Sequence, residues 1–163
     1  MRANHLHRFP EWQERLRRAV ASVKGTLIEE TLDRPHVNAL YHLADAYVSL
    51  HRSEGFGLTI AEAMRVGKPV IATDYSGPRD FLNQSNGYPV RYRLVELEQD
   101  YGPYQAGNVW AEPEVAHAAL LTRQVLGNAA ERSAKGQRAA LDIERLYGSQ
   151  AIARRIASRL SRL

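Results

Sequence analysis

The stretch that decides the fold is VSLHRSEGFGLTIAEAMRVGKPVIAT, residues 48–73. Its first residues form a short, mostly apolar run that ends near Leu50 and predicts a buried strand. A loop with two glycines follows, and residues 59–66 then have a helical spacing that stops at Gly67. A second β-branched run, Val70–Thr73, completes the stretch. The order strand, helix, strand predicts a parallel βαβ unit.

Upstream of this unit, apolar side chains recur at helical spacing. We expect one helix from Pro10 to about Gly25, with Trp12 in the core, because proline is favoured in the first turn and glycine after the last. Thr26–Ile28 is short and β-branched and predicts a strand. Asp33 then predicts the N-cap of a second helix.

Downstream, residues 87–90 predict an edge strand, whereas residues 91–110 lose periodicity and predict an irregular surface loop. Helices resume from about Pro113, and the last is expected to begin after a cap at Ser149. Strands that alternate with helices predict an α/β fold, a Rossmann-like parallel sheet with helices on both faces. The length of 163 residues fits a single domain that covers the whole chain.

The composition is that of a soluble globular protein. Hydrophobic residues make up 44% of the chain and charged residues 25%, which argues against disorder. No run of roughly 18 apolar residues could span a bilayer, and the N-terminus lacks the apolar core of a secretory signal. Because the chain has no cysteine, disulfides, thiolate metal sites and a cysteine nucleophile are excluded. We therefore expect a cytoplasmic protein.

The net charge of +4 is unevenly distributed along the chain. Residues 115–163 carry nine basic and three acidic side chains, while the other 114 residues carry 13 basic and 15 acidic ones. A basic face could bind phosphates, but no aromatic side chains interleave these arginines as single-strand binding requires. We interpret the basic residues as a solvated helix surface and expect no nucleic-acid partner.

The loop between the predicted strand and helix lies where a ligand would bind. In parallel α/β sheets the ligand crevice lies outside the carboxyl ends of the strands. Gly55 and Gly57 have no side chains to hold phosphates away, and the first-turn N–H groups of the helix are unpaired donors. Glu54 and Glu62 flank this cradle, and their carboxylates accept hydrogen bonds from hydroxyls. A ligand with phosphate in the middle and hydroxyls at both ends fits, and a nucleotide sugar is such a ligand.

Other roles for these residues remain open at this point. Thr59 and Glu62 have the spacing of a capping box, in which Thr59 caps the helix and Glu62 bonds back to the cap, and the glycines could serve a tight turn. The dipeptide His51–Arg52 either contacts the ligand or supplies polar groups at a strand end. Asp74 and Ser76 follow the next strand and either edge the same crevice or form a turn.

The run from Glu54 through Glu62 to Pro69-Val70 resembles the donor-site signature of the retaining GT-B glycosyltransferases, in the glycogen-synthase-like and mannosyltransferase-like group known as glycosyl transferases group 1. The mark of that signature is two glutamates separated by seven residues, followed by a Gly-x-Pro-Val turn into a strand. The resemblance continues to Trp110–Pro113 and covers roughly Phe9 to the C-terminus. It implies the C-terminal, donor-binding half of a GT-B fold.

The resemblance also implies a role for each residue of the loop. Glu54, the predicted catalytic residue, would approach the hydroxyls of the donor sugar, and Glu62 would bind the ribose hydroxyls. The backbone between them would line the sugar and the diphosphate, at Gly55, Phe56, Gly57, Leu58 and Thr59. The reaction would transfer a glycosyl unit from a nucleoside-diphosphate sugar, GDP- or UDP-linked, to an acceptor hydroxyl with retention at the anomeric carbon. Dipoles and cations would stabilise the leaving diphosphate, and no metal or other cofactor is expected.

The chain departs from the family pattern near its start. Family members have a further Rossmann-like domain for the acceptor, and their donor domain opens with βα units that bear an arginine and a lysine for the diphosphate. None of the three lysines here follows such a strand, so Arg2 or Arg8 would have to substitute. We therefore expect a donor domain that is incomplete at its N-terminus, completed by another domain or subunit, and acting on an unknown acceptor. The alternative is a non-catalytic module, derived from such an enzyme, that binds a nucleotide sugar or a partner.

Overall fold

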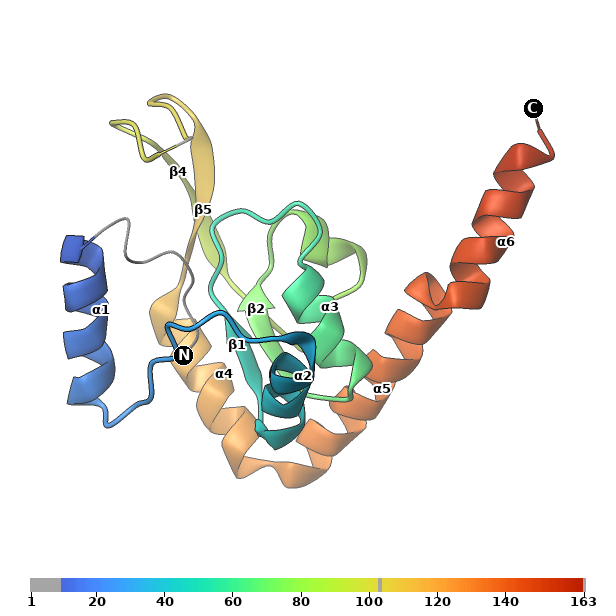
Figure 1. Ribbon diagram of the computed structural model, residues 1–163, viewed down its shortest axis with the longest axis horizontal. Helices are drawn as coiled ribbons and strands as arrows, with labels where there is room; N and C mark the ends of the chain where they lie inside the picture. The colour runs from blue at the N-terminus through green and yellow to red at the C-terminus, as the bar shows by residue number, and fades with distance from the viewer. Residues whose placement is uncertain (1–9, 103, 163) are drawn as a thin grey trace. The chain divides into compact units, whose positions relative to one another are not determined.

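A computed structural model of the chain describes residues 10–102 and 104–162. The chain divides into two compact units, Met1–Ala39 and Leu40–Leu163, and each unit is described by itself. Figure 1 shows the elements coloured in chain order, from the helix α1 to the helix α6. None of the helices in the described ranges is both long and apolar enough to cross a bilayer.

The first unit contains the helix α1, Pro10–Ser22, which begins at the predicted proline. The side chains of Gln13 and Arg17 both donate hydrogen bonds to the carboxylate of Glu29. These bonds tie the helix to the segment that follows it, and they lower the pKa of Glu29, with the bond from Gln13 as the larger cause.

Two expectations for this unit are wrong. Trp12 is 58% exposed rather than in the core, and the Arg15 guanidinium lies 5.1 Å from the centroid of its ring. Thr26–Ile28 is not one of the named strands: Ile28 makes a β-bridge, but Thr26 and Leu27 have no regular secondary structure. Helical periodicity shows which face of a helix is apolar, but it does not show that anything covers that face.

The helix α2, Arg34–Leu43, follows the predicted N-cap Asp33. The Asp33 carboxylate accepts a hydrogen bond from the backbone N–H of His36 at 3.0 Å, as an N-cap does. That bond, and a second one from the His36 side chain, hold the pKa of Asp33 below its usual value. Pro35 lies in the first turn, where its missing N–H removes no helical hydrogen bond.

A three-stranded parallel sheet forms the centre of the second unit. Its strands are β1, Tyr47–Ser49, β2, Val70–Thr73, and β3, Tyr88–Val90, in the order β1-β2-β3. The register pairs Val48 with Ile71 and Ile71 with Tyr88. The predicted βαβ unit and the predicted edge strand are therefore confirmed.

One connection follows the carboxyl end of β1 and leads to β2, and a second follows the carboxyl end of β2 and leads to β3. The helix α3, Leu58–Arg65, lies between β1 and β2, and the 3-10 helix η2, Gly77–Asp80, lies between β2 and β3. All four residues of β2 are buried, so both faces of this central strand are covered. The helix α3 contacts β1 and β2, whereas the helix α4 contacts β2 and β3. The predicted α/β fold is confirmed.

The core holds the ends of the strands in place. Ile71, Tyr88 and Val90 of the sheet pack against Ala118 and Val125 of α4, and none of these five side chains is more than 4% exposed. Four residues of α3 are also buried, namely Ile60, Ala61, Ala63 and Met64. Burial of each large apolar side chain stabilises the fold by about 1.5–3 kcal/mol. The strand ends from which the loops leave the sheet are therefore held in place.

The expectation of an irregular loop over residues 91–110 is wrong. The strands β4, Tyr92–Glu96, and β5, Val109–Pro113, form an antiparallel pair in which Leu94 lies opposite Ala111. Neither strand alternates cleanly between buried and exposed residues, because much of this two-stranded ribbon is open to solvent. Local periodicity therefore gave no signal, and the pairing joins residues well separated in the chain.

The helices that were predicted from about residue 113 are confirmed. They are α4, Val115–Gly127, α5, Ala129–Tyr147, and α6, Ser149–Leu160. Ser149 is the first residue of α6 rather than its cap, because Gly148 occupies the N-cap position.

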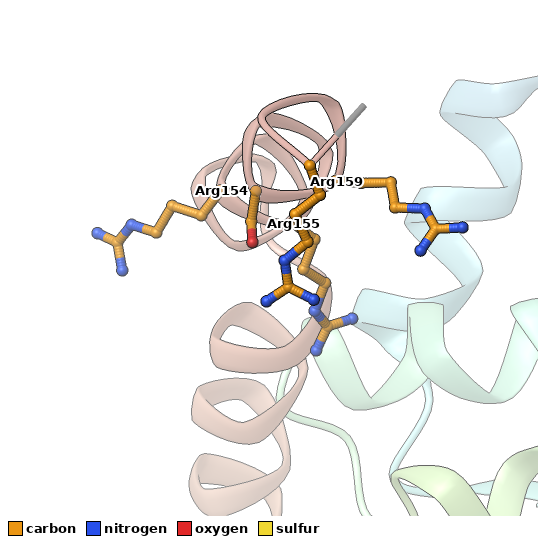
Figure 2. A pocket seen from close by; sticks show the side chains of 5 residues that line it. Arg154, Arg155 and Arg159 are labelled. Atoms are coloured by element: carbon orange, nitrogen blue, oxygen red, sulfur yellow. The ribbon is translucent and has the colours of Figure 1, made fainter.

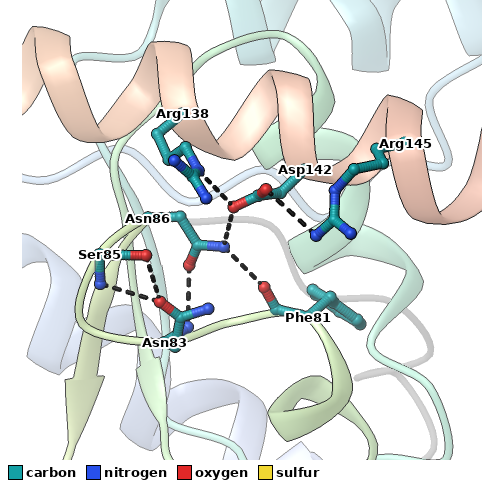
Figure 3. A network of polar contacts seen from close by, with 7 residues as sticks. All are labelled: Phe81, Asn83, Ser85, Asn86, Arg138, Asp142 and Arg145. Carbon is teal, nitrogen blue, oxygen red and sulfur yellow. Dashed lines mark hydrogen bonds and ion pairs between the residues drawn. The ribbon is translucent and has the colours of Figure 1, made fainter.

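A buried polar network attaches α5 to the loop before β3 (Figure 3). Asp142 is 6% exposed and Asn86 is 1% exposed. The Asn86 amide donates to the Asp142 carboxylate at 3.0 Å and to the carbonyl oxygen of Phe81 at 2.8 Å. Arg138 and Arg145 donate to the same carboxylate at 3.1 Å and 3.4 Å. The carboxylate is thus surrounded by donors, as a buried charge requires.

The backbones of α5 and of the turn after α3 also approach each other closely. A Cβ atom added to Gly136 would lie 2.1 Å from the backbone oxygen of Gly67. Gly67 has a φ of +75°, which glycine adopts readily. Glycine at position 136 therefore allows the close approach of α5 to this turn, and glycine at position 67 allows the turn's left-handed conformation.

Candidate functional site

Two loops at the carboxyl ends of β1 and β2 form the candidate site. Residues 50–57 connect β1 to α3 and contain the predicted cradle, and residues 74–76 connect β2 to η2. Because β1 and β2 are parallel neighbours, both loops leave the same edge of the sheet. Ligands of α/β sheets bind at this edge.

Gly57 is the N-cap of α3, and its φ of +86° lies in the left-handed region. A Cβ atom at this position would lie 2.7 Å from Cγ of Pro78, so only glycine fits. No side chain of the described residues caps this end of α3. The first-turn N–H groups therefore remain available as donors at the positive end of the helix dipole.

The capping-box alternative for Thr59 and Glu62 is wrong. Because Gly57 is the N-cap, Thr59 is the second residue of α3, and Glu62 lies beyond the first turn. The Thr59 hydroxyl accepts a hydrogen bond from the Tyr47 hydroxyl at 2.8 Å. The Glu62 carboxylate accepts one from the Tyr41 hydroxyl at 3.1 Å. The structure therefore gives Glu62 no role in helix capping.

Glu54 is held through its backbone. Its N–H donates to Oγ of Ser76 at 3.0 Å, and its carbonyl accepts from the same Oγ at 2.6 Å and from the N–H of Gly77 at 3.2 Å. Its side chain is half-buried, and within the described ranges no hydrogen bond or ion pair engages its carboxylate. The fold fixes the position of this residue and leaves its charged group for another partner.

Tyr41 and Tyr47 join the site, although the sequence did not single them out for it. Burial is the largest cause that raises the pKa of Tyr47; the hydrogen bond to Thr59 opposes it, and the negative charges of Glu54 and Glu62 add to it. The negative charges of both predicted glutamates therefore disfavour ionisation of this one hydroxyl. A tyrosine in a helix stripe or a strand resembles an ordinary core residue, so no local signal marked these two.

The other predicted loop residues have distinct surroundings. The ring of Phe56 packs against Phe81 and Tyr147, with centroid distances of 5.3 Å and 5.1 Å. Leu58 is 62% exposed, and a Cβ atom at Gly55 would meet nothing within 4 Å. Phe56 thus fixes the loop through its side chain, while the side of Gly55 on which a Cβ atom would lie stays open to a ligand.

Arg52 is engaged by the β4–β5 hairpin. Its guanidinium donates to the Glu112 carboxylate at 2.7 Å and 3.0 Å and lies 4.9 Å from the centroid of the Trp110 ring. Its carbonyl accepts from the N–H of Ala111 at 3.0 Å. Trp110 in turn lies 5.3 Å from the ring of Tyr101. Arg52 therefore has a structural partner, which agrees with the polar-group alternative for this position.

His51 links the two loops of the site. Its Nε2 lies 3.1 Å from the carbonyl oxygen of Tyr75, and because a carbonyl only accepts, Nε2 is the donor. The other ring nitrogen, Nδ1, is buried and has no partner among the described residues. Asp74 lies 3.5 Å from the guanidinium of Arg79, so the acidic residue of the second loop is paired within that loop and η2.

The basic residues of α6 do not converge on one point. Figure 2 shows the side chains of Arg154, Arg155 and Arg159 pointing in different directions from the helix. This arrangement agrees with a solvated helix surface. A shallow pocket on α6 is lined by Arg154, Arg155, Ser158, Arg159 and Arg162.

Arg2 and Arg8, named above as substitutes for the diphosphate cations, lie outside the described residues.

Known proteins resemble the chain in sequence. Residues 25–91 match the family Glycosyl transferases group 1. The "UDP-N-acetylglucosamine--peptide N-acetylglucosaminyltransferase GtfA subunit" of Streptococcus agalactiae is 30% identical over 106 residues, which are 64% of this chain and 20% of that protein. The matched family segment contains both glutamates, the glycine loop and α3. These matches support a glycosyltransferase domain.

Solved structures resemble the chain in fold. Anabaena HepE in complex with UDP and glucose matches with a TM-score of 0.69 and 18% identity, over 94% of this chain and 37% of that one. Sucrose-phosphate synthase from Thermosynechococcus elongatus matches with a TM-score of 0.70 and 19% identity, over 93% of this chain and 34% of that one. The fold is that of GT-B glycosyltransferases, and the chain spans about a third of these structures.

Proposed function

We propose that the chain is the donor-binding domain of a glycosyltransferase that uses a nucleoside-diphosphate sugar and retains the anomeric configuration. One observation carries this proposal. Glu54 and Glu62 flank a glycine loop at the N-terminus of α3, within the segment that matches the glycosyltransferase family. Neither carboxylate serves as a cap of α3, and the negative charges of both add to the raised pKa of the Tyr47 hydroxyl.

Each part of the site then has a task in binding the donor. Glu54 accepts hydrogen bonds from hydroxyls of the donor sugar, and Glu62 accepts them from the ribose. The diphosphate between these two ends lies against the backbone of the loop and the first-turn N–H groups of α3. The residues that supply this backbone are Gly55, Phe56, Gly57, Leu58 and Thr59.

The chemistry that this arrangement supplies is electrostatic. When the bond between the anomeric carbon and the diphosphate oxygen breaks, negative charge develops on that oxygen. Backbone N–H groups at the start of α3 already point along the helix dipole toward it and need no reorganisation. The acceptor hydroxyl forms the new bond to the same face of the anomeric carbon and passes its proton to the departing diphosphate oxygen.

The names of similar proteins guide the choice of donor. The relative from Streptococcus agalactiae is named for UDP-N-acetylglucosamine, and the HepE structure contains UDP and glucose. We therefore propose a UDP-linked sugar as the first donor to test, with GDP- and ADP-linked sugars beside it.

The acceptor side of the reaction requires more protein. Because the chain spans 20% of the matched relative, which is itself named as a subunit, we propose that another domain or a partner subunit provides the acceptor site. The donor domain then includes the whole chain, with its C-terminal helices from about residue 113.

The test is calorimetric binding of UDP-glucose, UDP-N-acetylglucosamine, GDP-mannose and ADP-glucose to the chain and to Glu62→Ala. Loss of hydrogen bonds to a charged carboxylate costs about 1.5–3 kcal/mol, so the dissociation constant should rise about 10- to 100-fold. Glu98→Ala, an exposed glutamate in the hairpin connection, is the matched control and should bind as the unaltered chain does. Equal affinity in Glu62→Ala and Glu98→Ala would contradict the assignment.

A second measurement separates an enzyme from a non-catalytic binding module. In the presence of the acceptor domain or subunit, the chain should release nucleoside diphosphate from the donor that it binds, and Glu54→Gln should slow that release. Binding of the donor without any transfer under these conditions would favour the binding module.

A further inference from the structure

Ser76 contacts Glu54, although the two residues are 22 positions apart in the chain. The sequence alone therefore does not indicate this contact. Its Oγ donates to the carbonyl oxygen of Glu54 at 2.6 Å and accepts from the N–H of the same residue at 3.0 Å. One hydroxyl therefore satisfies both peptide groups of Glu54. The N–H of Gly77 adds a third bond to the same carbonyl at 3.2 Å.

The backbone of Ser76 is unusual for a residue with a side chain. Its φ is +56° and its ψ is −144°, and within the described ranges only Lys24 is a further non-glycine residue with a positive φ. Such a conformation is strained for a residue with a Cβ atom, and strained residues cluster at functional sites. Glycine would fit this backbone with less strain, but it would bring no hydroxyl to Glu54.

Two further contacts join the same loops. A Cβ atom on Gly77 would lie 2.2 Å from the carbonyl oxygen of Gly55, and one on Gly57 would lie 2.7 Å from Cγ of Pro78. The loop that carries the cradle is thus packed against residues 76–78 at three successive points. The loop therefore cannot shift without moving residues 76–78. Of these contacts, the hydrogen bonds of the Ser76 hydroxyl are the ones that hold Glu54 itself.

The other polar residues of the turn are engaged elsewhere. The Asp74 carboxylate is near the Arg79 guanidinium, and the carbonyl of Tyr75 is bonded to His51. Within the described part of the chain, the side chain of Ser76 is the one from this turn that reaches Glu54.

We propose that Ser76 is a positioning residue for donor binding, which rests on the function proposed above. By holding both peptide groups of Glu54, its hydroxyl fixes the direction from which the Glu54 carboxylate meets the hydroxyls of the donor sugar. It does not touch the donor. Its contribution is preorganisation, so that the loop is ordered before the ligand arrives and binding does not have to order it.

The contribution of the Ser76 hydroxyl to binding affinity should differ between a nucleotide sugar and a nucleoside diphosphate. Glu54 faces the sugar, whereas the diphosphate lies against the glycine loop and α3. Loss of the Ser76 hydroxyl should therefore weaken binding of a nucleotide sugar more than binding of the nucleoside diphosphate alone. A residue that merely supports folding would change both affinities by the same factor.

The experiment compares Ser76→Ala and Ser76→Gly with the control Ser85→Ala, using calorimetric binding of UDP-glucose and of UDP. Both Ser76 variants should raise the dissociation constant for UDP-glucose about tenfold and that for UDP about twofold or less. The glycine variant removes the hydroxyl and also relieves the backbone strain, so it should melt no lower than the alanine variant and guards against a failure to fold. Ser85, whose hydroxyl bonds to Asn83, should leave both affinities unchanged.

A double-mutant cycle with Glu54→Gln completes the test. If Ser76 acts through Glu54, Ser76→Ala should have little further effect on UDP-glucose binding in the Glu54→Gln background. Equal losses for both ligands, full additivity in the cycle, or unchanged UDP-glucose binding in both Ser76 variants would each overturn the inference. Failure of the unaltered chain to bind any nucleotide sugar would instead overturn the proposed function, so the two failures are distinguishable.

Discussion

Replacement of Asp142 tests whether the buried network under β3 stabilises the fold. Asp142→Ala removes the carboxylate that accepts from Asn86, Arg138 and Arg145. The bond from the buried Asn86 amide to a charged acceptor contributes about 1.5–3 kcal/mol. The two arginine side chains are 59% and 68% exposed, so each pair adds only about 0–1 kcal/mol. The expected loss in the free energy of unfolding is therefore about 1.5–5 kcal/mol.

Asp142→Asn separates the charge from the shape of the carboxylate. An asparagine oxygen can still accept from Asn86, so this variant should lose about 1–2 kcal/mol, less than the alanine variant. Urea unfolding measures both losses, and for a chain of this size each kcal/mol lowers the melting temperature by about 2–4 °C. Asp45→Asn, at an exposed position, is the control and should change the free energy of unfolding by less than about 0.5 kcal/mol. A loss below about 0.5 kcal/mol in Asp142→Ala would refute the reasoning.

The same network has a pH dependence of known sign. Burial of Asp142 acts to raise its pKa, but the hydrogen bonds from Asn86 and Arg138 and the positive charge of Arg138 outweigh burial, so its pKa lies below the usual 3.8. A carboxyl with a lowered pKa in the folded state contributes stability that is present above its unfolded pKa and is lost as the pH falls through the folded value. The difference between the unaltered chain and Asp142→Asn should therefore be constant near neutral pH and shrink below about pH 4. A difference that grows on acidification would contradict the assignment.

Two further changes test the packing around the site. Gly136→Ala places a methyl carbon 2.1 Å from the carbonyl oxygen of Gly67, in the turn after α3. Urea unfolding should show a loss of about 1–3 kcal/mol in the free energy of unfolding. The control Gly127→Ala has nothing within 4 Å of the added methyl group, so its stability should be unchanged or slightly higher. Equal stability of these two variants would show that α3 and α5 are not in close contact. Arg52→Ala removes the guanidinium from the ring of Trp110, so in a Trp12→Phe background the tryptophan emission should shift to longer wavelength and acrylamide should quench it more strongly. Unchanged emission and quenching would contradict the observed contact.

The sequence predicted the parallel part of the fold because its signals are local. All four residues of β2 are buried, so they read as a continuous apolar run, and Gly67 and Pro69 mark the turn that leads into it. The cap at Asp33 was likewise visible, because a short acidic side chain immediately before a helix has few other roles.

The hairpin and the start of α3 required information that no local window holds. Residues 92–96 and 109–113 pair across an intervening segment and leave many side chains exposed, so neither burial nor periodicity marks them. The helix α3 begins one residue earlier than expected because Gly57 serves as the N-cap in a left-handed conformation that is compatible with the nearby Pro78. That contact is tertiary, so the capping box remained an open alternative until the structure excluded it.

The candidate site also contains some residues that the sequence predicts and others that only the fold reveals. The glutamates and glycines were found from their spacing, because a strand, a glycine loop and a helix N-terminus form one continuous segment. Tyr41, Tyr47 and the hydroxyl contact of Ser76 come from other segments, and only the fold brings them to the loop.

Phe56 offers a handle for engineering the loop. Its ring packs against Phe81 and Tyr147, while its backbone belongs to the cradle beside Gly55 and Gly57. Side-chain replacements at this one position would therefore change how tightly the loop is anchored without changing the peptide groups that it presents. A graded series of smaller aliphatic residues there would tune the rate at which a bound ligand leaves, and the groups that recognise the ligand would stay the same.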